Sequence, residues 1–320
     1  MPVLDARQLD ATLACPGCGE SRWAATDSEL SCTACKRIVG IDAGVLLLDG
    51  GAPDPIGVYY DDIGGPHFVG TTFETNLHVH LATLAYERLF AEFFPKPGLT
   101  LVDLGCGDGR LSLWALRQGF RVVAVDRTLA PLKRLTAAAD ASGLRGLIVA
   151  QAPFNTPLLR AESFDVALAI EAFTYLGDRY SEGLRSLRRL LREDGRGVVS
   201  EFCRSGRVLA DVIAVNLENM RAVATDGRRF EKAGRHKLVQ RLFRVAELAE
   251  ECQKAGFEVV ASRGISPIPM LFHFAHTFTS YPLRPALDSE LERTLAALDL
   301  EASALSDLSR NAVMLLRKAR

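Results

Sequence analysis

The sequence predicts an α/β protein with a parallel central sheet covered by helices on both faces, preceded by a small cysteine-rich module. From Gly98 onward, short apolar segments alternate with segments of helical periodicity, which is the pattern of a covered parallel sheet. A glycine-rich loop connects the first of these apolar segments to the helical segment that follows it. Four of the seven cysteines lie within the first 35 residues, apart from the rest of the pattern.

Each expected strand is a short apolar run, and each expected helix repeats apolar residues at a spacing of three or four. The expected strands are Leu99–Leu104, Arg121–Asp126, Gly146–Ala150, Phe164–Ile170, Gly197–Phe202, Phe257–Ser262 and Ala312–Leu316. The helices expected among them are Arg110–Gln118, Leu129–Ala141, Tyr180–Leu191, Val245–Ala255 and a segment near 288–299. Strands separated by helices in this way favour a doubly covered parallel sheet.

The chain divides into three expected parts: a cysteine module at 1–50, a helical cap or linker at 51–97, and an α/β domain at 98–320. Glycine and proline residues between 50 and 57 separate the first two parts. An amphipathic pattern from Leu77 to Phe93 predicts a helix in the cap. Within the α/β domain we expect an irregular insertion at about 204–244.

The composition is that of a folded protein, with 48% hydrophobic and 24% charged residues and a net charge of −1. A protein that binds nucleic acid over its whole surface is usually basic, so such a partner would need a local basic patch. No apolar run approaches the roughly 18–20 residues of a membrane span. The first residues lack the pattern of a signal peptide. We therefore expect a cytoplasmic protein with no membrane partner.

A glycine-rich loop follows the first expected strand, with the sequence Val102-Asp103-Leu104-Gly105-Cys106-Gly107-Asp108-Gly109. Glycines let the backbone turn tightly and approach a ligand closely. A dinucleotide-binding fingerprint would place its third glycine at Arg110, one residue later. The next strand ends at Asp126, where an acid can accept hydrogen bonds from ribose hydroxyls. Together these features predict a nucleoside pocket; the alternative is a structural turn beside a solvated acid.

These segments resemble the class I S-adenosylmethionine-dependent methyltransferases, of the type 11 kind. The family's first two motifs resemble residues 102–109 and 122–126, and further matches lie at 163–168, 187–195 and 243–257. The resemblance covers roughly residues 56–320. It implies a Rossmann-like sheet of seven strands with an antiparallel last strand, S-adenosyl-L-methionine as cofactor, and methyl transfer as the activity.

The resemblance also implies which residues contact the cofactor. Members often hold the adenine amino group with an acid after the third strand, but this chain has Gln151 there, whose carbonyl or backbone is expected to substitute. Tyr60 matches the aromatic residues near the start of many members. The full expected cofactor-binding set is Tyr60, Asp103, Gly105, Cys106, Gly107, Gly109, Asp126, Arg127, Gln151, Ala152 and Glu171.

Three residues are candidates for a catalytic role. Glu171 follows the fourth strand of the α/β domain at the ligand edge, and the resemblance places this loop beside the methyl group. Methyl transfer mainly requires alignment, and a base is needed only where the acceptor must lose a proton. His78 and His273 are candidate bases, with ordinary structural histidines as the alternative. The loop after Glu171 lacks the motif that amino methylation of adenine often uses.

The cysteine module contains two Cys-x2-Cys pairs separated by 13 residues: Cys15 with Cys18, and Cys32 with Cys35. Four thiolates at this spacing match tetrahedral Zn²⁺ and leave no ligand position open, which predicts a structural site. A module of about 40 residues buries little core, so a metal would supply much of its stability. Two disulfides or a redox pair are the alternative.

The module resembles a small zinc-ribbon family whose members activate methyltransferases or are fused to them. It is also similar to the N-terminal zinc modules of some bacterial ribosomal-RNA guanine methyltransferases, which raises RNA as a substrate. However, residues 1–50 carry seven acidic and four basic side chains, a net charge of −3, which suits phosphate poorly. We therefore interpret the module as a scaffold or a wall of the pocket.

The expected insertion is basic: residues 221–244 carry eight basic and two acidic side chains, a net charge of +6. In the resembled family the corresponding segment often covers the substrate. A basic cover suits an acidic or phosphorylated small molecule, or RNA. The alternative is a solvated surface that balances the acidic N-terminal part.

The sequence therefore favours a methyltransferase of specialised metabolism that acts on a small molecule. A ribosomal or transfer RNA methyltransferase with a zinc recognition module is the main alternative. Two weaker alternatives are a non-catalytic scaffold with a methyltransferase fold and a nicotinamide-dependent oxidoreductase. The intact glycine loop and Asp126 disfavour the scaffold, and the glycine spacing disfavours the oxidoreductase.

Overall fold

The structure is a computed structural model of the 320-residue chain. It describes residues 5–48, 69, 73–94, 96–213, 216–233, 236–265, 289–290, 292–293 and 308–319. For some residues within the helices and strands of these ranges it describes the backbone but not the side chain. Among the described helices, none is long and apolar enough to cross a membrane.

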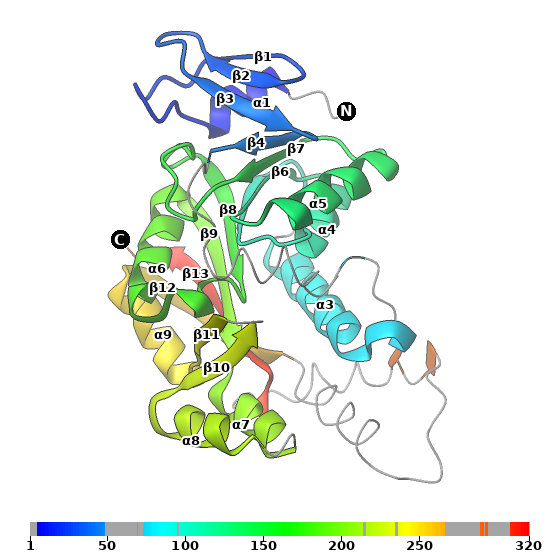
Figure 1. Ribbon diagram of the computed structural model, residues 1–320, viewed down its shortest axis with the longest axis vertical. Coiled ribbons are helices and arrows are strands. Elements are labelled where there is room, and N and C mark those ends of the chain that lie inside the picture. The colour runs from blue at the N-terminus through cyan, green and yellow to red at the C-terminus, as the bar shows by residue number, and fades with distance from the viewer. Residues whose placement is uncertain are drawn as a thin grey trace.

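A single mixed sheet organises the molecule (Figure 1), in the order β1-β2-β3-β4-β7-β6-β5-β8-β9-β13-β12. Its last seven strands are the sheet that the sequence predicts, with β13 antiparallel to both of its neighbours. These strands are β5 (Thr100–Leu104), β6 (Arg121–Asp126), β7 (Leu147–Gln151), β8 (Phe164–Ile170), β9 (Leu191–Phe202), β12 (Phe257–Ile265) and β13 (Asn311–Lys318). The α/β fold class is thus confirmed.

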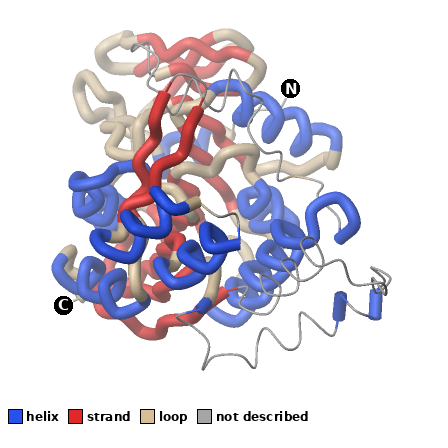
Figure 2. Tube along the Cα trace, turned by 60° about the horizontal axis from the view of Figure 1, so that its bottom comes forward, coloured by secondary structure: helices blue, strands red, loops and turns tan. Residues whose placement is uncertain are grey.

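Helices pack on both faces of this sheet (Figure 2). One face carries α3 (Phe73–Phe93), α4 (Arg110–Arg117) and α5 (Leu129–Ala141); the other carries α6 (Tyr180–Leu190) and α9 (Val245–Lys254). Successive strand residues such as Val122 and Val123 belong to different core clusters, because neighbouring side chains of a strand point to opposite faces. Both faces are therefore apolar, as expected for covered parallel strands.

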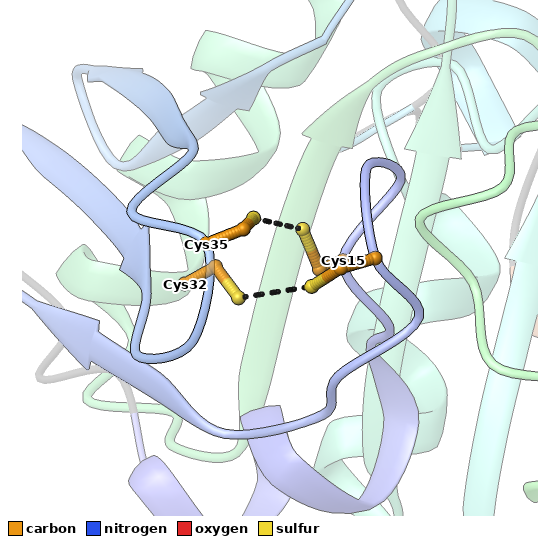
Figure 3. Close-up of side chains that lie close together, drawn as sticks. Cys15, Cys32 and Cys35 are labelled. Carbon is orange, nitrogen blue, oxygen red and sulfur yellow. Dashed lines mark hydrogen bonds between the residues drawn. The ribbon is translucent and has the colours of Figure 1, made fainter.

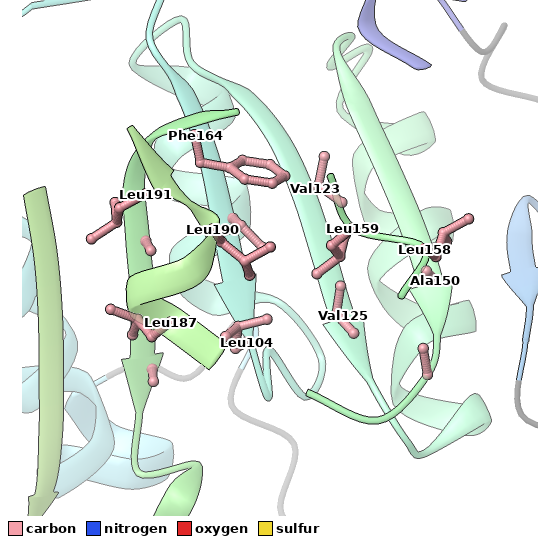
Figure 4. Close-up of a cluster of buried hydrophobic side chains, with 14 of the residues drawn as sticks. Leu104, Val123, Val125, Ala150, Leu158, Leu159, Phe164, Leu187, Leu190 and Leu191 are labelled. Atoms are coloured by element: carbon pink, nitrogen blue, oxygen red, sulfur yellow. The ribbon is translucent and has the colours of Figure 1, made fainter. Parts of the chain in front are cut away.

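The core beneath α6 shows this packing directly (Figure 4). Leu187 and Leu190 of α6 lie over Leu104 and the strand residues Val123 and Val125, and all are buried. Leu158 and Leu159, from the loop after β7, extend the same cluster toward the N-terminal module. The α6 core is thus continuous with the buried Leu9 and Leu13 of the N-terminal module.

The N-terminal module extends the sheet rather than forming a separate one. It contains α1 (Ala6–Thr12), β1 (Trp23–Ala25), β2 (Glu29–Cys32), β3 (Ile38–Asp42) and β4 (Val45–Leu47). The first four strands pair antiparallel in a row, and β4 then pairs parallel with β7. Consequently, the sheet passes without interruption from the cysteine module to the glycine-loop strands.

The insertion at 204–244 is regular, not irregular as expected. It forms α7 (Arg204–Ile213), α8 (Leu217–Asp226) and a hairpin of β10 (Arg228–Ala233) with β11 (His236–Arg241). Asn216 caps α8 by accepting a hydrogen bond from the Asn219 N–H at 3.1 Å. Gly227, in the left-handed conformation, ends α8 and leads into the hairpin.

The largest boundary difference lies between α6 and β9. The sequence predicts a helix to Leu191 and a strand from Gly197, but the helix ends at Leu190 and the strand begins at Leu191. Leu191 pairs with Phe164, and the next pair joins Val166 to Arg196. Residues 192–195 therefore bulge out of the ladder, which conceals the early start of β9.

Candidate active site

The glycine loop runs from the end of β5 to the start of α4 and is fastened to β6. The N–H groups of Gly105 and Cys106 both donate to the Val125 carbonyl oxygen, at 2.8 and 3.1 Å. Gly105 and Gly109 have positive φ values of 75° and 79°, where residues with a side chain are disfavoured. A Cβ at Gly109 would also lie 2.3 Å from a methyl carbon of Leu135. The loop thus requires glycine for conformation and for packing.

Asp126 lies at the tip of β6, beside this loop. Its Oδ2 accepts a hydrogen bond from the Gly107 N–H at 2.9 Å, and its Oδ1 accepts one from the Thr128 N–H at 2.9 Å. Burial raises the pKa of Asp126 above its usual range, because desolvation outweighs these hydrogen bonds. The side chain therefore connects the glycine loop to the carboxyl end of the sheet, which is where ligands bind in such folds.

Gln151 stands next to Asp126, because the two residues are partners in the β6–β7 ladder. Its amide nitrogen donates to the Arg127 carbonyl oxygen at 3.1 Å. This bond orients the side chain, so its carbonyl oxygen is the atom suited to accept a hydrogen bond from a ligand. The N–H of Ala152 donates to the Asp126 carbonyl oxygen at 2.9 Å and fixes the start of the following loop.

Asp103 lies beneath the glycine loop and is almost completely buried. Its Oδ2 accepts a hydrogen bond from the Ser112 hydroxyl at 2.7 Å. Burial raises the pKa of Asp103 to about 6, and the nearby charge of Asp126 acts in the same direction. The described contacts give Asp103 a role in holding the loop against α4; its contact with a cofactor stays a prediction.

Glu171 occupies the loop after β8, with a positive φ of 57° that is unusual for a residue with a side chain. Its two carboxylate oxygens pair with Arg110 at 3.4 Å and with Arg310 at 3.5 Å. Burial alone would raise the pKa of Glu171, but the guanidinium groups of Arg310 and Arg110 hold it below its usual range. Glu171 is thus a carboxylate that stays ionised, held between two cations.

A second buried acid supports the loop that carries Glu171. Glu201, near the end of β9, accepts a hydrogen bond from the Phe173 N–H at 3.1 Å and is fully buried. Burial, together with the charge of Glu171, raises the pKa of Glu201 well above its usual range. Glu201 therefore holds the first turn of the 3-10 helix η1 (Phe173–Arg179) at the carboxyl edge of the sheet.

The four cysteines of the N-terminal module converge on one point (Figure 3). Their sulfur atoms all lie within 4.8 Å of one another, with Cys15 and Cys35 at 3.5 Å and Cys18 and Cys32 at 3.6 Å. Tetrahedral zinc with bonds of about 2.3 Å separates its sulfur ligands by roughly 3.8 Å. All seven cysteines of the chain are described and free of disulfides. The thiol cluster therefore fits a tetrahedral metal ion, and its sulfur–sulfur separations of 3.5 and 3.6 Å are longer than the roughly 2.0 Å of a disulfide bond.

The geometry agrees with comparisons to known proteins. A family model described as a methyltransferase domain matches residues 78–262, more than half of the chain. The chain belongs to this methyltransferase family. The ubiquinone biosynthesis O-methyltransferase of Caulobacter vibrioides is 36% identical over 132 residues, which are 40% of this chain and 51% of that protein. The nocamycin O-methyltransferase of Saccharothrix syringae is 37% identical over 113 residues, 34% and 40% of the two chains.

The chain thus spans about half the length of the curated relatives it matches. Among solved structures, the 1,6-didemethyltoxoflavin-N1-methyltransferase of Burkholderia thailandensis, which contains S-adenosylhomocysteine, is similar with a TM-score of 0.51. It is 20% identical, and the match covers 92% of this chain and 100% of that chain. At this identity the likeness shows the fold alone, which is a methyltransferase fold.

In this methyltransferase-family protein, the structure brings most of the expected cofactor residues to one edge of the sheet. Asp126 and Gln151 end β6 and β7, and Arg127 and Ala152 follow them, while the glycine loop and Glu171 follow β5 and β8. The Cys106 thiol points back to the Gly107 carbonyl oxygen at 3.6 Å, so its backbone is the part that faces β6. Tyr60 and His273 lie outside the described residues, and of His78 only the backbone, within α3, is described.

Sequence reasoning missed the cations that surround Glu171. Arg110 follows the glycine loop directly, and its position at the first turn of α4 was the available signal. Its guanidinium also donates to the Thr83 hydroxyl at 3.1 Å, which connects α4 to α3. Arg310 lies 139 residues from Glu171 and belongs to no motif. Glu201 was missed as well, because an acid within an apolar strand carries no local signal.

In the described part of the basic insertion, several arginines form ion pairs with nearby acidic side chains. Arg228 pairs with Asp178 at 3.2 Å, and Arg229 pairs with the buried Asp211 at 3.5 Å. Two further arginines pair in the same way, Arg241 with Glu251 and Arg244 with Glu247. These contacts favour a structural role for the arginines, and a substrate or RNA contact of residues 221–244 stays a prediction.

Proposed function

We propose that this protein transfers the methyl group of S-adenosylmethionine to a small-molecule acceptor. The observation that carries the proposal is the fastened glycine loop beside Asp126, both at the carboxyl edge of β5 and β6. The names of the sequence relatives, which are small-molecule O-methyltransferases, support the substrate class. The compensated charge of the insertion also supports a small acceptor over RNA.

The chemistry is a displacement in which an acceptor atom attacks the methyl carbon and the carbon–sulfur bond breaks. S-adenosylhomocysteine leaves, and an acceptor hydroxyl or protonated amine also loses its proton. Asp126 would accept hydrogen bonds from the ribose hydroxyls, and the Gln151 carbonyl oxygen would accept one from the adenine amino group. The protein's main contribution is alignment of the acceptor, the methyl group and the sulfur.

Glu171, which follows the end of β8, would lie beside the methyl group that is transferred. Its pairing with Arg110 and Arg310 makes it a weak base, which suits it to orienting a polar acceptor more than to removing a proton of high pKa. His78 and His273 remain candidate bases for an acceptor that must be deprotonated.

We also infer that Cys15, Cys18, Cys32 and Cys35 hold one structural Zn²⁺. The convergence of four sulfur atoms supports a closed site, because no ligand position is left for a substrate. Each Cys-x2-Cys turn ends in a left-handed residue, Gly19 in the first and Lys36 in the second. Metal analysis of the purified protein is expected to give one zinc per chain.

Transfer of labelled methyl tests the substrate class. The protein is incubated with methyl-labelled S-adenosylmethionine and a cell extract, with and without nuclease. Label in a low-mass product that resists nuclease is the expected result. Label in nuclease-sensitive material would replace the small-molecule proposal with RNA methylation.

A further inference from the structure

The end of β7, which carries Gln151, is covered on its outer edge by the cysteine module. Val45, Leu46 and Leu47 of β4 pair with Val149, Ala150 and Gln151 in a parallel ladder. The Leu48 N–H then donates to the Gln151 carbonyl oxygen at 3.1 Å. The module therefore contacts the backbone of the residue that, under the proposed function, faces the adenine.

The module also fastens the loop that continues from β7. The Ala14 N–H donates to the Leu158 carbonyl oxygen at 2.7 Å, and the Arg160 N–H donates to the Thr12 carbonyl oxygen at 2.9 Å. The buried Gln8 amide donates to the carbonyl oxygens of Val122 and Gly146, at 3.2 and 3.0 Å. These bonds connect α1 and the residue before Cys15 to the loop after β7 and to the amino-terminal ends of β6 and β7.

Two of the four thiols belong to the apolar core that supports this wall. Cys15 and Cys32 are buried in the same cluster as Ile148 and Ala150 of β7 and as Ala152 just beyond it. The other two cysteines, Cys18 and Cys35, are exposed at the outer side. A metal ion bound by all four thiols would thus connect the exposed Cys18 and Cys35 to the apolar core, which continues beneath the cofactor site.

We propose that the four-cysteine module builds the adenine-side wall of the cofactor site, so that metal occupancy of the cysteines sets cofactor affinity. The proposal rests on the proposed function, because it places the adenine beside Gln151. The module is too small to hold β4 in register through its own core, and metal binding supplies that stability. Loss of the metal therefore leaves β7 as a sheet edge and removes the support of residues 151–153.

Calorimetric binding of S-adenosylhomocysteine to the full chain tests the proposal. Cys18→Ser removes one ligand at an exposed position, and Ala34→Ser adds the same hydroxyl at an exposed position of the neighbouring turn. The zinc-free Cys18→Ser protein is expected to bind about tenfold more weakly, the scale of one lost buried hydrogen bond. Ala34→Ser is expected to keep both its zinc and its affinity.

Two further measurements keep the test decisive if Cys18→Ser does not fold. Leu48→Pro removes the N–H that reaches Gln151 while leaving all four cysteines, so zinc is retained and affinity still falls. In chelator-treated wild-type protein, amide exchange in Leu147–Gln151 is expected to accelerate and to recover after zinc is restored. Unchanged affinity in metal-free protein would overturn the proposal, whereas absent binding in zinc-loaded wild-type protein would instead refute the proposed function.

Discussion

Asp126 is the residue on which cofactor binding most depends. Its carboxylate already orders the Gly107 and Thr128 amides, and each oxygen has a further lone pair for a ribose hydroxyl. Asp126→Asn removes the charge from these hydrogen bonds, so the dissociation constant for S-adenosylhomocysteine is expected to rise by at least about tenfold. Calorimetry measures this change. The exposed Asp194→Asn, on the opposite edge of the sheet, is the control, and equal affinities in both variants would contradict the assignment.

Asp103 gives a pH dependence of stability whose sign follows from its raised pKa. The native pKa of about 6 exceeds the unfolded value of 3.8, so the native state holds the extra proton between these limits. Stability from Asp103 is therefore present below about pH 4 and is lost as the pH rises through 6. Relative to Asp103→Asn, which does not titrate, the wild type is expected to lose up to roughly 3 kcal/mol between pH 4 and 7. Denaturant unfolding of both proteins across this range measures the difference. If their free energies of unfolding change with pH in the same way, the native state does not hold an extra proton on Asp103.

Residues near a motif were predictable, and residues that meet only through the fold were not. The glycine loop and Asp126 follow from strand ends that can be read locally. The Arg110–Glu171–Arg310 cluster joins three separate strand ends, and nothing in the sequence near Arg310 indicates that it reaches Glu171. Charged residues found at strand ends are usually solvated, which is why such clusters are found only in the structure.

At the scale of elements, the turn from β5 into α4 depends on glycine more strictly than the turn after α5 does. Gly109→Ala places a Cβ against Leu135 in addition to forcing a positive φ, whereas Gly143→Ala, after α5, meets no atom within 4 Å. The first change is expected to lower the free energy of unfolding by about 2–3 kcal/mol and the second by about 1 kcal/mol. Chemical denaturation compares the two. Equal losses of unfolding free energy in the two variants would mean that the Leu135 side chain moves away from the added Cβ without cost.

The loop after β8 makes a second prediction at this scale. Glu201 holds the Phe173 N–H as a buried, neutral acid, so Glu201→Gln keeps an accepting oxygen without adding charge. It is expected to change the free energy of unfolding by less than about 1 kcal/mol, while Glu201→Ala costs about 2–3 kcal/mol through the cavity and the orphaned N–H. Thermal or chemical unfolding of both variants measures the difference. A Gln variant as unstable as the Ala variant would show that the acid is ionised.

Buried strands were the most predictable elements, because a parallel strand covered on both faces is apolar throughout its length. The hairpin β10–β11 was not predicted, since its charged residues obscure the alternation and its partner strand has the same composition. The early start of β9 was missed for a related reason: Arg192, Glu193 and Asp194 in the bulge are exposed and charged.

At the scale of the whole molecule, one sheet runs from the cysteine turns through the antiparallel strand β13 to β12. The sequence indicated both the cysteine module and the methyltransferase sheet, but not their junction. Pairing of β4 with β7 joins residues about a hundred positions apart, and parallel pairing across such a distance has no local signature. The continuity matters for function, because it places the thiol cluster and Gln151 in one packed structure.

The most direct test of the account is a calorimetric titration of the wild-type protein with S-adenosylmethionine, and with NADH under the same conditions. A pocket built from the glycine loop and Asp126 is expected to bind one S-adenosylmethionine per chain and to show no binding of NADH. Binding of NADH in place of S-adenosylmethionine, or no binding of S-adenosylmethionine to protein with its zinc in place, would contradict the assignment of this edge of the sheet as a methyl-donor site.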